Sequence, residues 1–159
     1  MGKEIERKFL VSGDFFKKEA TTVQHIVQGY LSTVPERTVR VRIKGDQGYI
    51  TIKGKCSTSG ASRFEWEKEI SVEDAKHLLL LCEPGVIDKS RYLIPEAGGL
   101  TFEVDEFYGD NQGLILAELE LPEEDTSYIS PPWLGKEVTG DKRYYNAMLI
   151  KNPFKNWNH

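Results

Sequence analysis

The opening residues of the chain carry charged side chains at alternate positions. Glu4, Glu6 and Lys8 stand two residues apart, so in a β-strand all three would project from the same face. Two carboxylates offer the hard oxygen ligands that Mg²⁺ or Mn²⁺ prefers, and an ammonium one step along offers a point charge for a phosphoryl oxygen. An ordinary solvated strand face also carries Glu and Lys. The triplet alone therefore leaves both interpretations open.

The same alternation recurs along the chain. The further sets are Arg40/Arg42/Lys44, Lys53/Lys55, Arg63/Glu65/Glu67/Glu69, Lys89/Arg91, Glu103/Asp105 and Glu118/Glu120. The positions between them are largely apolar, as in Val39, Val41 and Ile43. This period of two predicts antiparallel strands with two chemically different faces.

Periodicity does not tell which of the two faces points inward. The charged positions are almost wholly acids and bases, with Arg prominent, whereas solvated faces usually mix in Thr, Ser and Gln. A row of Arg side chains on neighbouring strands would repel itself unless anions or interleaved carboxylates neutralised it. We therefore favour a charged, ligand-binding interior over a solvated outer face.

Length and composition bound the class of protein. The chain has 159 residues, of which 39% are hydrophobic and 29% charged, and we expect one domain over residues 1–159. No run approaches the roughly 18 apolar residues that a membrane-spanning helix needs. The charged start does not resemble a signal peptide, so we expect a cytoplasmic protein without a membrane partner.

Charge and the reactive residue types exclude several classes of function. The net charge of −4 argues against a nucleic-acid partner, because phosphate-backbone binding requires a broad basic surface; localised bases suit a small polyanion better. Cys56 and Cys82 lie far apart and are expected to be free thiols. The three histidines are scattered, so neither a His-based metal site nor a Ser-His-Asp hydrolase is predicted.

Eight strands and two helices are expected. The strands are predicted near residues 3–11, 25–33, 37–45, 48–55, 63–71, 88–94, 100–107 and 114–121. A capped amphipathic helix is predicted over 72–83, with its four consecutive leucines in the core. A second helix is predicted from about 139 to 151. If the charged faces enclose a cavity, these helices and the aromatic stretch 133–157 must cover the apolar outside.

The charged motifs also follow one another in a fixed order. They are Glu4-Ile5-Glu6-Arg7-Lys8-Phe9, Arg40-x-Arg42, Lys53, Arg63-x-Glu65-x-Glu67, Lys89-x-Arg91, Glu103-x-Asp105, Glu118-x-Glu120 and Asp141-Lys142-Arg143-Tyr144. Together they resemble the CYTH family of triphosphate tunnel metalloenzymes, over residues 3 to about 150, and are most similar to its short bacterial members. The resemblance implies a mainly β, α+β fold: a closed eight-stranded antiparallel barrel, or tunnel, with a charged interior and a few covering helices.

The resemblance also implies roles for individual residues. Divalent metal, Mg²⁺ or Mn²⁺, would be bound by Glu4, Glu6, Asp105, Glu118 and Glu120. The phosphates would be held by Lys8, Arg40, Arg42, Lys53, Lys89, Arg91 and Lys142. Catalytic roles would fall to Lys8 and Tyr30, with Glu67 and Glu120 as candidates for accepting a proton from the attacking water. For Lys44, Lys55, Arg63, Glu69 and Glu103, charge balance or solvation is the favoured interpretation.

The activity implied by the resemblance is metal-dependent hydrolysis of inorganic triphosphate to pyrophosphate and phosphate. Similar tunnels serve class IV adenylate cyclases and thiamine triphosphatases, and a module that binds polyphosphate or nucleoside triphosphates without turnover is the non-enzyme alternative. No adenine pocket can be identified in the sequence, and Trp66, Trp133 and Trp157 are thiamine-platform candidates in number only. Similar proteins are often homodimers, although no residue here marks an interface.

Overall fold

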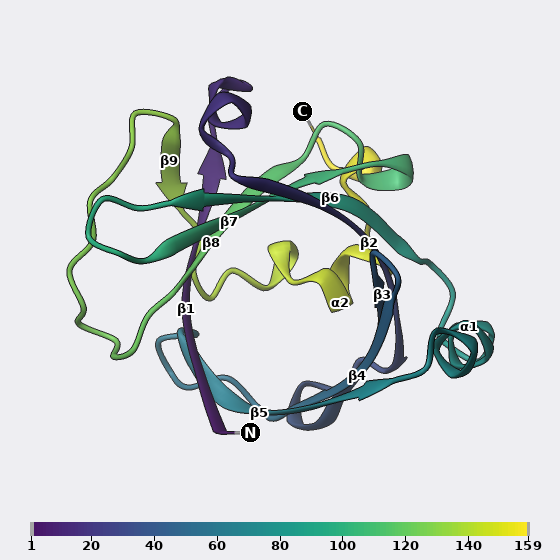
Figure 1. Cartoon of the computed structure of the whole chain (residues 1–159). Helices are drawn as coiled ribbons and strands as arrows, with labels where there is room; N and C mark the ends of the chain where they lie inside the picture. The colour runs from purple at the N-terminus through teal and green to yellow at the C-terminus, as the bar shows by residue number, and fades with distance from the viewer. Residues whose placement is uncertain (1, 159) are drawn as a thin grey trace.

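The sheet of this protein closes on itself, as a computed structural model describing residues 2–158 shows. Its strands are β1 (Gly2–Val11), β2 (Thr22–Ser32), β3 (Thr38–Lys44), β4 (Gln47–Lys53), β5 (Ser62–Ile70), β6 (Ile87–Pro95), β7 (Thr101–Phe107), β8 (Ile115–Glu120) and β9 (Leu134–Glu137). The strand order is β5-β4-β3-β2-β6-β7-β8-β1-β9, and an additional pairing of β5 with β1 closes eight strands into a ring (Figure 1). All pairings are antiparallel. The predicted eight-stranded barrel is confirmed.

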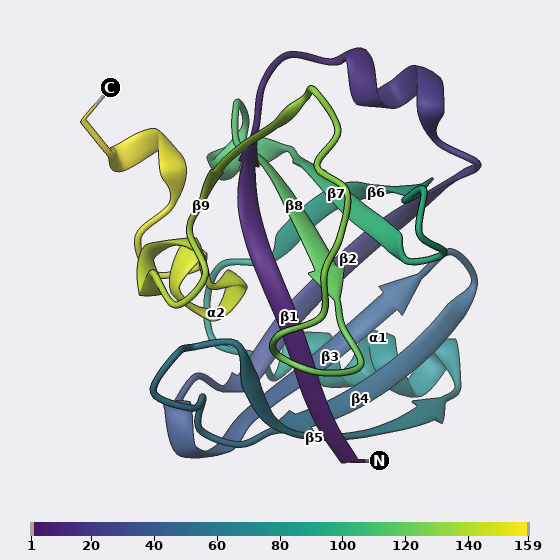
Figure 2. The same ribbon diagram turned by 90° about the vertical axis from the view of Figure 1, so that its left-hand side faces the viewer.

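One long strand makes the closure. The first residues of β1 pair with β5, with Glu4 opposite Arg63, and the later ones pair with β8, with Lys8 opposite Glu118. The ninth strand, β9, was not predicted; it pairs with the far end of β1, where Phe9 lies opposite Glu137. Figure 2 shows β1 running along the wall of the barrel, with β9 beside it.

Apolar side chains cover the outside of the barrel on one flank. Phe9, Val104, Leu119 and their neighbours stand at the alternate positions of β1, β7 and β8, and Phe16 and Trp133 pack over them. The ring of Trp133 makes an edge contact with the ring of Phe102, with 5.2 Å between the centroids. The apolar face of these strands is thus buried on the outside of the barrel wall, as a barrel with a charged interior requires.

Helix α1 (Val72–Leu80) packs outside the barrel against β2, β3 and β4. It begins as predicted, because the Ser71 side chain accepts a hydrogen bond from the Asp74 backbone nitrogen at 3.0 Å. The approach is close: a Cβ atom added to Gly48 would lie 2.9 Å from Cβ of Ala75.

The expectation that all four leucines lie in the core is wrong. Leu78 and Leu79 are half-buried and belong to neither core cluster, and Leu80 and Leu81 are 82% and 72% exposed. The helix contacts the barrel through the side that carries Ala75 and Leu79, and at 100° per residue Leu80 projects away from that side. The helix also ends three residues earlier than predicted.

The predicted C-terminal helix is not continuous. A 3-10 turn at Lys142–Tyr144 is followed by Tyr145 in extended conformation (φ −70°, ψ 132°), and only then by the short helix α2 (Asn146–Leu149). In the view down the barrel, α2 and the segment before it lie across the centre of the ring (Figure 1). This segment therefore faces the interior, where an outer cover was expected.

The interior is charged along most of its length and apolar at one end. Ile87, Phe107 and Leu116 share the inward parity of the charged residues on β6, β7 and β8, and they pack with Leu149 and Tyr144. Ile87, Phe107, Leu116 and Leu149 are at most 2% exposed. These side chains fill the barrel next to α2, so the charged space is closed on that side.

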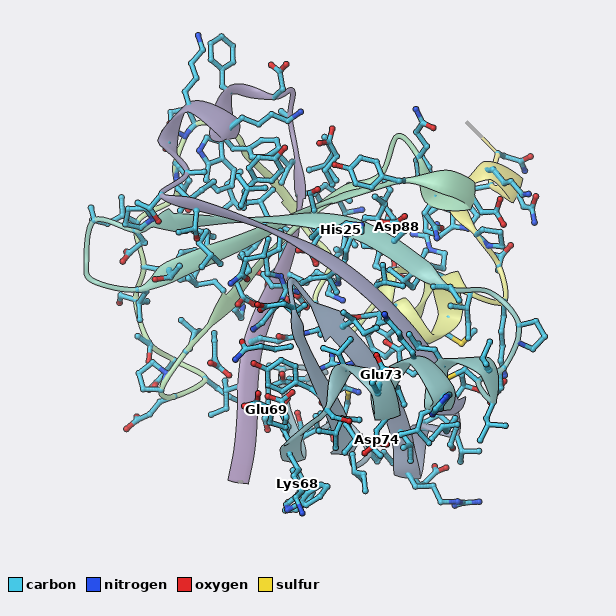
Figure 3. All side chains as sticks on the ribbon, turned by 45° about the vertical axis from the view of Figure 1, so that its right-hand side comes forward. His25, Lys68, Glu69, Glu73, Asp74 and Asp88 are labelled. Atoms are coloured by element: carbon cyan, nitrogen blue, oxygen red, sulfur yellow. The ribbon has the colours of Figure 1, made fainter. Side chains whose placement is uncertain are left out.

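The outer surface carries its own charges, which do not face the interior. His25 Nε2 lies 2.6 Å from Asp88 Oδ1 on the outer face of β2 and β6, and Glu73 and Asp74 stand in the first turn of α1 (Figure 3). Within residues 2–158, no helix is both long and apolar enough to cross a membrane.

Candidate active site

A cavity of about 630 Å³ occupies the charged part of the barrel. Its wall contains nearly every residue that the sequence singled out: Glu4, Glu6, Lys8, Tyr30, Arg40, Arg42, Lys53, Glu67, Lys89, Arg91, Glu118, Glu120 and Lys142. Four of the five charge-balance candidates, Lys44, Lys55, Arg63 and Glu103, line it as well. The exception among the predicted site residues is Asp105, which is 2% exposed and lies behind the wall.

Acids and bases occupy different sides of this wall. Carboxylates come from the neighbouring strands β7, β8, β1 and β5, whereas bases come mainly from β4, β3 and β6. Lys8 on β1 and Arg63 on β5 are the bases within the acidic half. A polyanion and a cation can therefore be held side by side, each against the wall of opposite charge.

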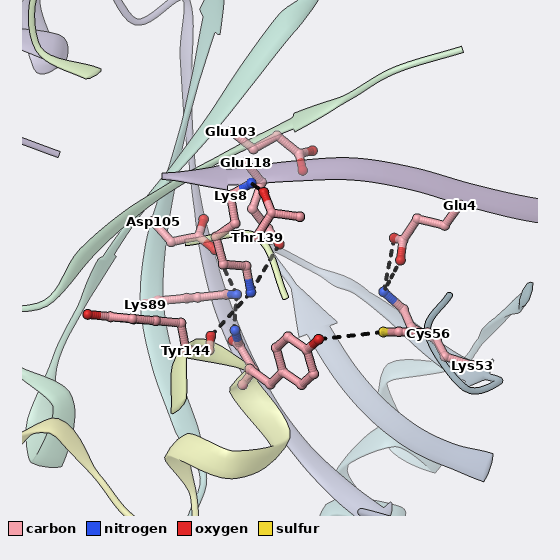
Figure 4. Close-up of polar contacts among 12 residues, drawn as sticks. Glu4, Lys8, Lys53, Cys56, Lys89, Glu103, Asp105, Glu118, Thr139 and Tyr144 are labelled. Atoms are coloured by element: carbon pink, nitrogen blue, oxygen red, sulfur yellow. Dashed lines mark hydrogen bonds and ion pairs between the residues drawn. The ribbon is translucent and has the colours of Figure 1, made fainter. Parts of the chain in front are cut away.

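Glu4 is held between two bases on the acidic side. Lys53 Nζ lies 3.0 Å from each oxygen of its carboxylate (Figure 4), and Arg63 Nε lies 3.4 Å from Oε1. Burial alone would raise the pKa of Glu4, but Lys53 and Arg63 outweigh burial and bring the pKa to about 2. Glu4 is therefore ionised at all ordinary pH values.

Glu6 and Glu118 have opposite protonation behaviour. Burial, together with the charges of Glu118 and Glu4, raises the pKa of Glu6 well above its usual range. Burial would raise the pKa of Glu118 too, but Lys8 and Arg91 outweigh it, and a hydrogen bond with Glu6 adds to their effect, so the pKa of Glu118 falls well below its usual range. The two side chains form a protonated and an ionised partner.

Asp105 holds two of the bases in place. Arg91 donates to both of its oxygens, at 2.8 and 2.9 Å, and Lys89 Nζ lies 2.8 Å from Oδ2 (Figure 4). Burial would raise the pKa of Asp105, but Arg91 and Lys89 outweigh it and lower the pKa. With both oxygens engaged and no face on the cavity, Asp105 is placed to position Lys89 and Arg91, which speaks against its expected role as a metal ligand.

The bases of the opposite wall are crowded and under-neutralised. Burial and the neighbouring Arg40 and Arg91 lower the pKa of Arg42 to about 9. Burial, with Arg91 and Arg42, lowers the pKa of Lys89 to about 7 although Asp105 opposes this. Arg40 is 9% exposed. Its Nε is buried, and no residue within 2–158 supplies a hydrogen-bond partner for it. A buried guanidinium nitrogen without an acceptor indicates a place for an anion.

Sequence reasoning missed several neutral residues that orient the charged ones. The Thr51 hydroxyl accepts from Arg40 Nη2 at 3.2 Å and donates to Glu67 Oε1 at 2.7 Å. Gln28 and Asn146 link Arg42 and Lys89. The signal for Gln28 and Thr51 was their inward parity on their strands, whereas Asn146 followed from no periodicity because its segment is irregular.

Tyr145 adds an aromatic side chain to the cavity wall near Lys8. Lys8 Nζ lies 5.5 Å from the centroid of its ring and donates to the Tyr144 carbonyl at 3.2 Å (Figure 4). The Tyr145 hydroxyl donates to Cys56 Sγ at 3.7 Å. Burial, with that hydrogen bond, raises the pKa of Tyr145 to about 12, so this phenol stays protonated.

The acidic side has the donor chemistry of a hard-cation site without a ready-made cluster. Among residues 2–158, no group of three or more His, Cys, Asp or Glu side chains is gathered as a metal would require. Glu6 faces Glu120 across β1 and β8, and the proton that Glu6 keeps beside Glu118 is one that a divalent cation could replace. The residue types therefore fit such an ion, provided that Glu4 and Glu118 turn from the bases that they now contact.

Comparisons with known proteins agree with this geometry. A model of the CYTH domain matches residues 2–146. The chain is 51% identical over 158 residues to an inorganic triphosphatase of Acetivibrio thermocellus, covering 99% of each chain. It is 40% identical over 149 residues to an inorganic triphosphatase of Nitrosomonas europaea, covering 92% of this chain and 95% of that one. A crystal structure of an inorganic triphosphatase is 35% identical, with a TM-score of 0.63 over 94% of this chain and 95% of the other.

Proposed function

The chain belongs to the CYTH domain family, and from this we propose that it is a divalent-metal-dependent enzyme that hydrolyses inorganic triphosphate to pyrophosphate and phosphate. The observation that carries the proposal is the basic wall of the cavity, where the buried Nε of Arg40 has no acceptor among the described residues. A compact polyanion supplies the missing acceptors and relieves the repulsion among Arg40, Arg42 and Arg91.

The bases bind and orient the substrate in this proposal. Lys8, Arg40, Arg42, Lys53, Lys89, Arg91 and Lys142 contact phosphoryl oxygens and neutralise the charge that spreads over them as the anhydride bond lengthens. Lys53 donates to Glu4 in the structure, so on substrate binding its ammonium exchanges the Glu4 carboxylate for a phosphoryl oxygen. Tyr30 is 4% exposed, and its hydroxyl accepts from Gln28, which leaves its proton free for a phosphoryl oxygen.

The carboxylates hold the metal, which we propose to be Mg²⁺ or Mn²⁺. Glu4, Glu6, Glu118 and Glu120 are the ligand candidates because they face the cavity from two adjacent strands. When bound, the ion lowers the pKa of a coordinated water and shields the charge of the triphosphate. Asp105 is not among the proposed ligands, because it does not line the cavity and Arg91 and Lys89 contact its oxygens.

Between the two candidates for accepting the water proton, we favour Glu120 over Glu67. Burial, with the charges of Glu4 and Glu103, raises the pKa of Glu120 in the metal-free protein, and Glu120 lies opposite Glu6 on the side of the cavity where the metal and its coordinated water would be held. Glu67 accepts a hydrogen bond from Thr51 and lies 3.5 Å from Arg40. Those contacts suit Glu67 for holding Arg40 in place.

The aromatic residues of the cavity favour inorganic triphosphate over nucleotide or thiamine substrates. The aromatic side chains on its wall are Tyr30 and Tyr145, and Lys8 already lies over the ring of Tyr145. None of the three tryptophans lines the cavity; Trp133 packs in the outer core and Trp157 packs on Tyr144. A flat base or thiazolium would have no free platform to stack on.

A phosphate-release panel tests the proposal. Tripolyphosphate, ATP, thiamine triphosphate and pyrophosphate are each supplied with Mg²⁺ or Mn²⁺, and with EDTA as the metal-free control. We expect tripolyphosphate to give the highest kcat/KM and EDTA to abolish release. Cyclic AMP formed from ATP would refute the choice of substrate, and tight binding of tripolyphosphate without release would indicate a binding module.

A further inference from the structure

Two neutral amides connect the basic wall to the C-terminal segment. Arg42 Nε donates to Gln28 Oε1 at 2.8 Å, and Gln28 Nε2 donates to Asn146 Oδ1 at 2.9 Å. Lys89 Nζ donates to the same Asn146 oxygen at 2.9 Å. Gln28 is fully buried behind the wall, whereas Asn146, the first residue of α2, lines the cavity.

The charged ends of this chain fix how both amides are turned. Arg42 has donors only, so the side of Gln28 that faces it must be the oxygen, and the nitrogen of Gln28 must then face Asn146. Lys89, in its ammonium form, also has donors only. Asn146 Oδ1 therefore receives two donors, and a flipped amide would bring its nitrogen against an ammonium and another NH₂ group.

The remaining group of Asn146 is its amide nitrogen. Residues 2–158 offer no hydrogen-bond acceptor to Nδ2 in the structure, although Oδ1 accepts two hydrogen bonds. Because Gln28 and Lys89 occupy Oδ1 and Asn146 lines the cavity, Nδ2 is the group of this side chain that is left for a ligand. A neutral NH₂ donor between Lys89 and Arg42 can bind a phosphoryl oxygen without adding to the repulsion among the bases.

We infer that Asn146 is a further substrate-binding residue whose Nδ2 donates to a phosphoryl oxygen, and that Gln28 is the positioning residue that fixes this orientation. The identity of the ligand rests on the proposed function. The C-terminal segment thereby joins the phosphate site through a side chain.

The substitution Asn146→Asp separates donation to the ligand from support of Lys89. The carboxylate still accepts from Gln28 and Lys89, but it turns an oxygen to the phosphate where an NH₂ group stood. Asn146→Ala removes both functions. Asn156→Asp, an exposed asparagine of the same segment, is the matched control for charge. The measurements are KM and kcat for tripolyphosphate with Mg²⁺, and the rise in melting temperature caused by tripolyphosphate in EDTA.

We expect KM to rise about tenfold or more in Asn146→Ala, the size of one lost charge-assisted hydrogen bond, and to rise further in Asn146→Asp. The tripolyphosphate-induced rise in melting temperature should shrink in the same order, and Asn156→Asp should match the wild type. An Asn146→Asp variant that binds like the wild type would overturn the inference while leaving the proposed function intact. A wild-type protein that neither binds nor hydrolyses tripolyphosphate would overturn both.

A double-mutant cycle tests the positioning role of Gln28. Measuring the effect of Asn146→Ala separately in each background cancels the effect of the charge that Gln28→Glu adds. Gln28→Glu keeps the acceptor for Arg42 but removes the donor to Asn146, so the Asn146 amide should turn over. In that background, Asn146→Ala should raise KM less than about threefold, because Nδ2 no longer donates to the phosphoryl oxygen once the amide has turned over. Equal costs of Asn146→Ala in both backgrounds would refute the role of Gln28. Melting curves without ligand establish that each variant is folded.

Discussion

Removing the Lys53 ammonium should destabilise the metal-free protein in a pH-dependent way. Lys53 is 7% exposed and contacts both oxygens of Glu4. Lys53→Met keeps the aliphatic stem and deletes the charge, so that Glu4 retains Arg63 alone. Lys55→Met, at an exposed position two residues along the chain, is the matched control.

The size of the effect follows from the pKa of Glu4. A fall from 4.5 to about 2 corresponds to about 3 kcal/mol of unfolding free energy at pH 7. Because Arg63 supplies part of this, we expect Lys53→Met to cost about 2 kcal/mol, or about 4–8 °C in melting temperature for a domain of this size.

The sign of the pH dependence is set by the lowered pKa. The contribution of Glu4 is complete above the pKa of the unfolded chain and is lost as the pH falls through the folded-state pKa. At pH 3 it has dropped to less than half of its value at pH 7, so the difference in melting temperature between Lys53→Met and wild type should shrink by about half. Thermal melts in EDTA at pH 7 and pH 3 measure this. A difference below 1 °C at pH 7, or an equal loss at both pH values, would refute the reasoning.

Three further outcomes are expected. Mg²⁺ with tripolyphosphate, at about 100 times its Kd, should raise the melting temperature by about 5–10 °C, since ligand binding at that excess adds about 2.7 kcal/mol; an unchanged melt would contradict a site in the barrel. Glu6→Gln mimics the protonated side chain, so its melting temperature in EDTA should stay within about 2 °C of wild type, while phosphate release with Mg²⁺ should fall about 100-fold or more; retained activity would exclude Glu6 as a ligand. Glu96→Ala removes the acceptor of the Gly98, Leu100 and Ile129 backbone N–H groups and should lower the melting temperature at pH 7 with KM unchanged. Those hydrogen bonds lower the pKa of Glu96, so this loss should shrink as the pH falls below about 4.5, and a loss that persists in acid would contradict it.

The barrel and most of its site were predictable because one pattern encodes both. Inward positions such as Glu4, Arg40 and Glu118 carry full charges, and the positions between them are apolar, so strand, face and site are read from the same alternation. The order of these charges along the chain then identified the family. The inward direction of the charged face was favoured from composition, and the cavity confirms it.

What failed depended on tertiary contacts that leave no periodic signal. Leu80 and Leu81 belong to an apolar run, and only the docking of α1 decides that they face solvent. The segment around Tyr145 has helical spacing, but Tyr145 itself is extended and interrupts the helix, with Lys8 Nζ over its ring. Asp105 shares the inward parity of the other acids, and no sequence pattern indicated that Arg91 would donate to its carboxylate. The single domain, the residue roles, the cytoplasmic location and a homodimer stay predictions.

The seam of the barrel and the first half of the site are the same strand. Strand β1 is the staple between β5 and β8, and its inward side chains are Glu4, Glu6 and Lys8. Loss of the β1 pairings would open the ring and remove the β1 side chains from the acidic wall at the same time. Closure of the ring and assembly of the acidic wall therefore depend on the same pairings, whose partners lie some 60 and 110 residues further along the chain, and pairings of such long range are slow to form.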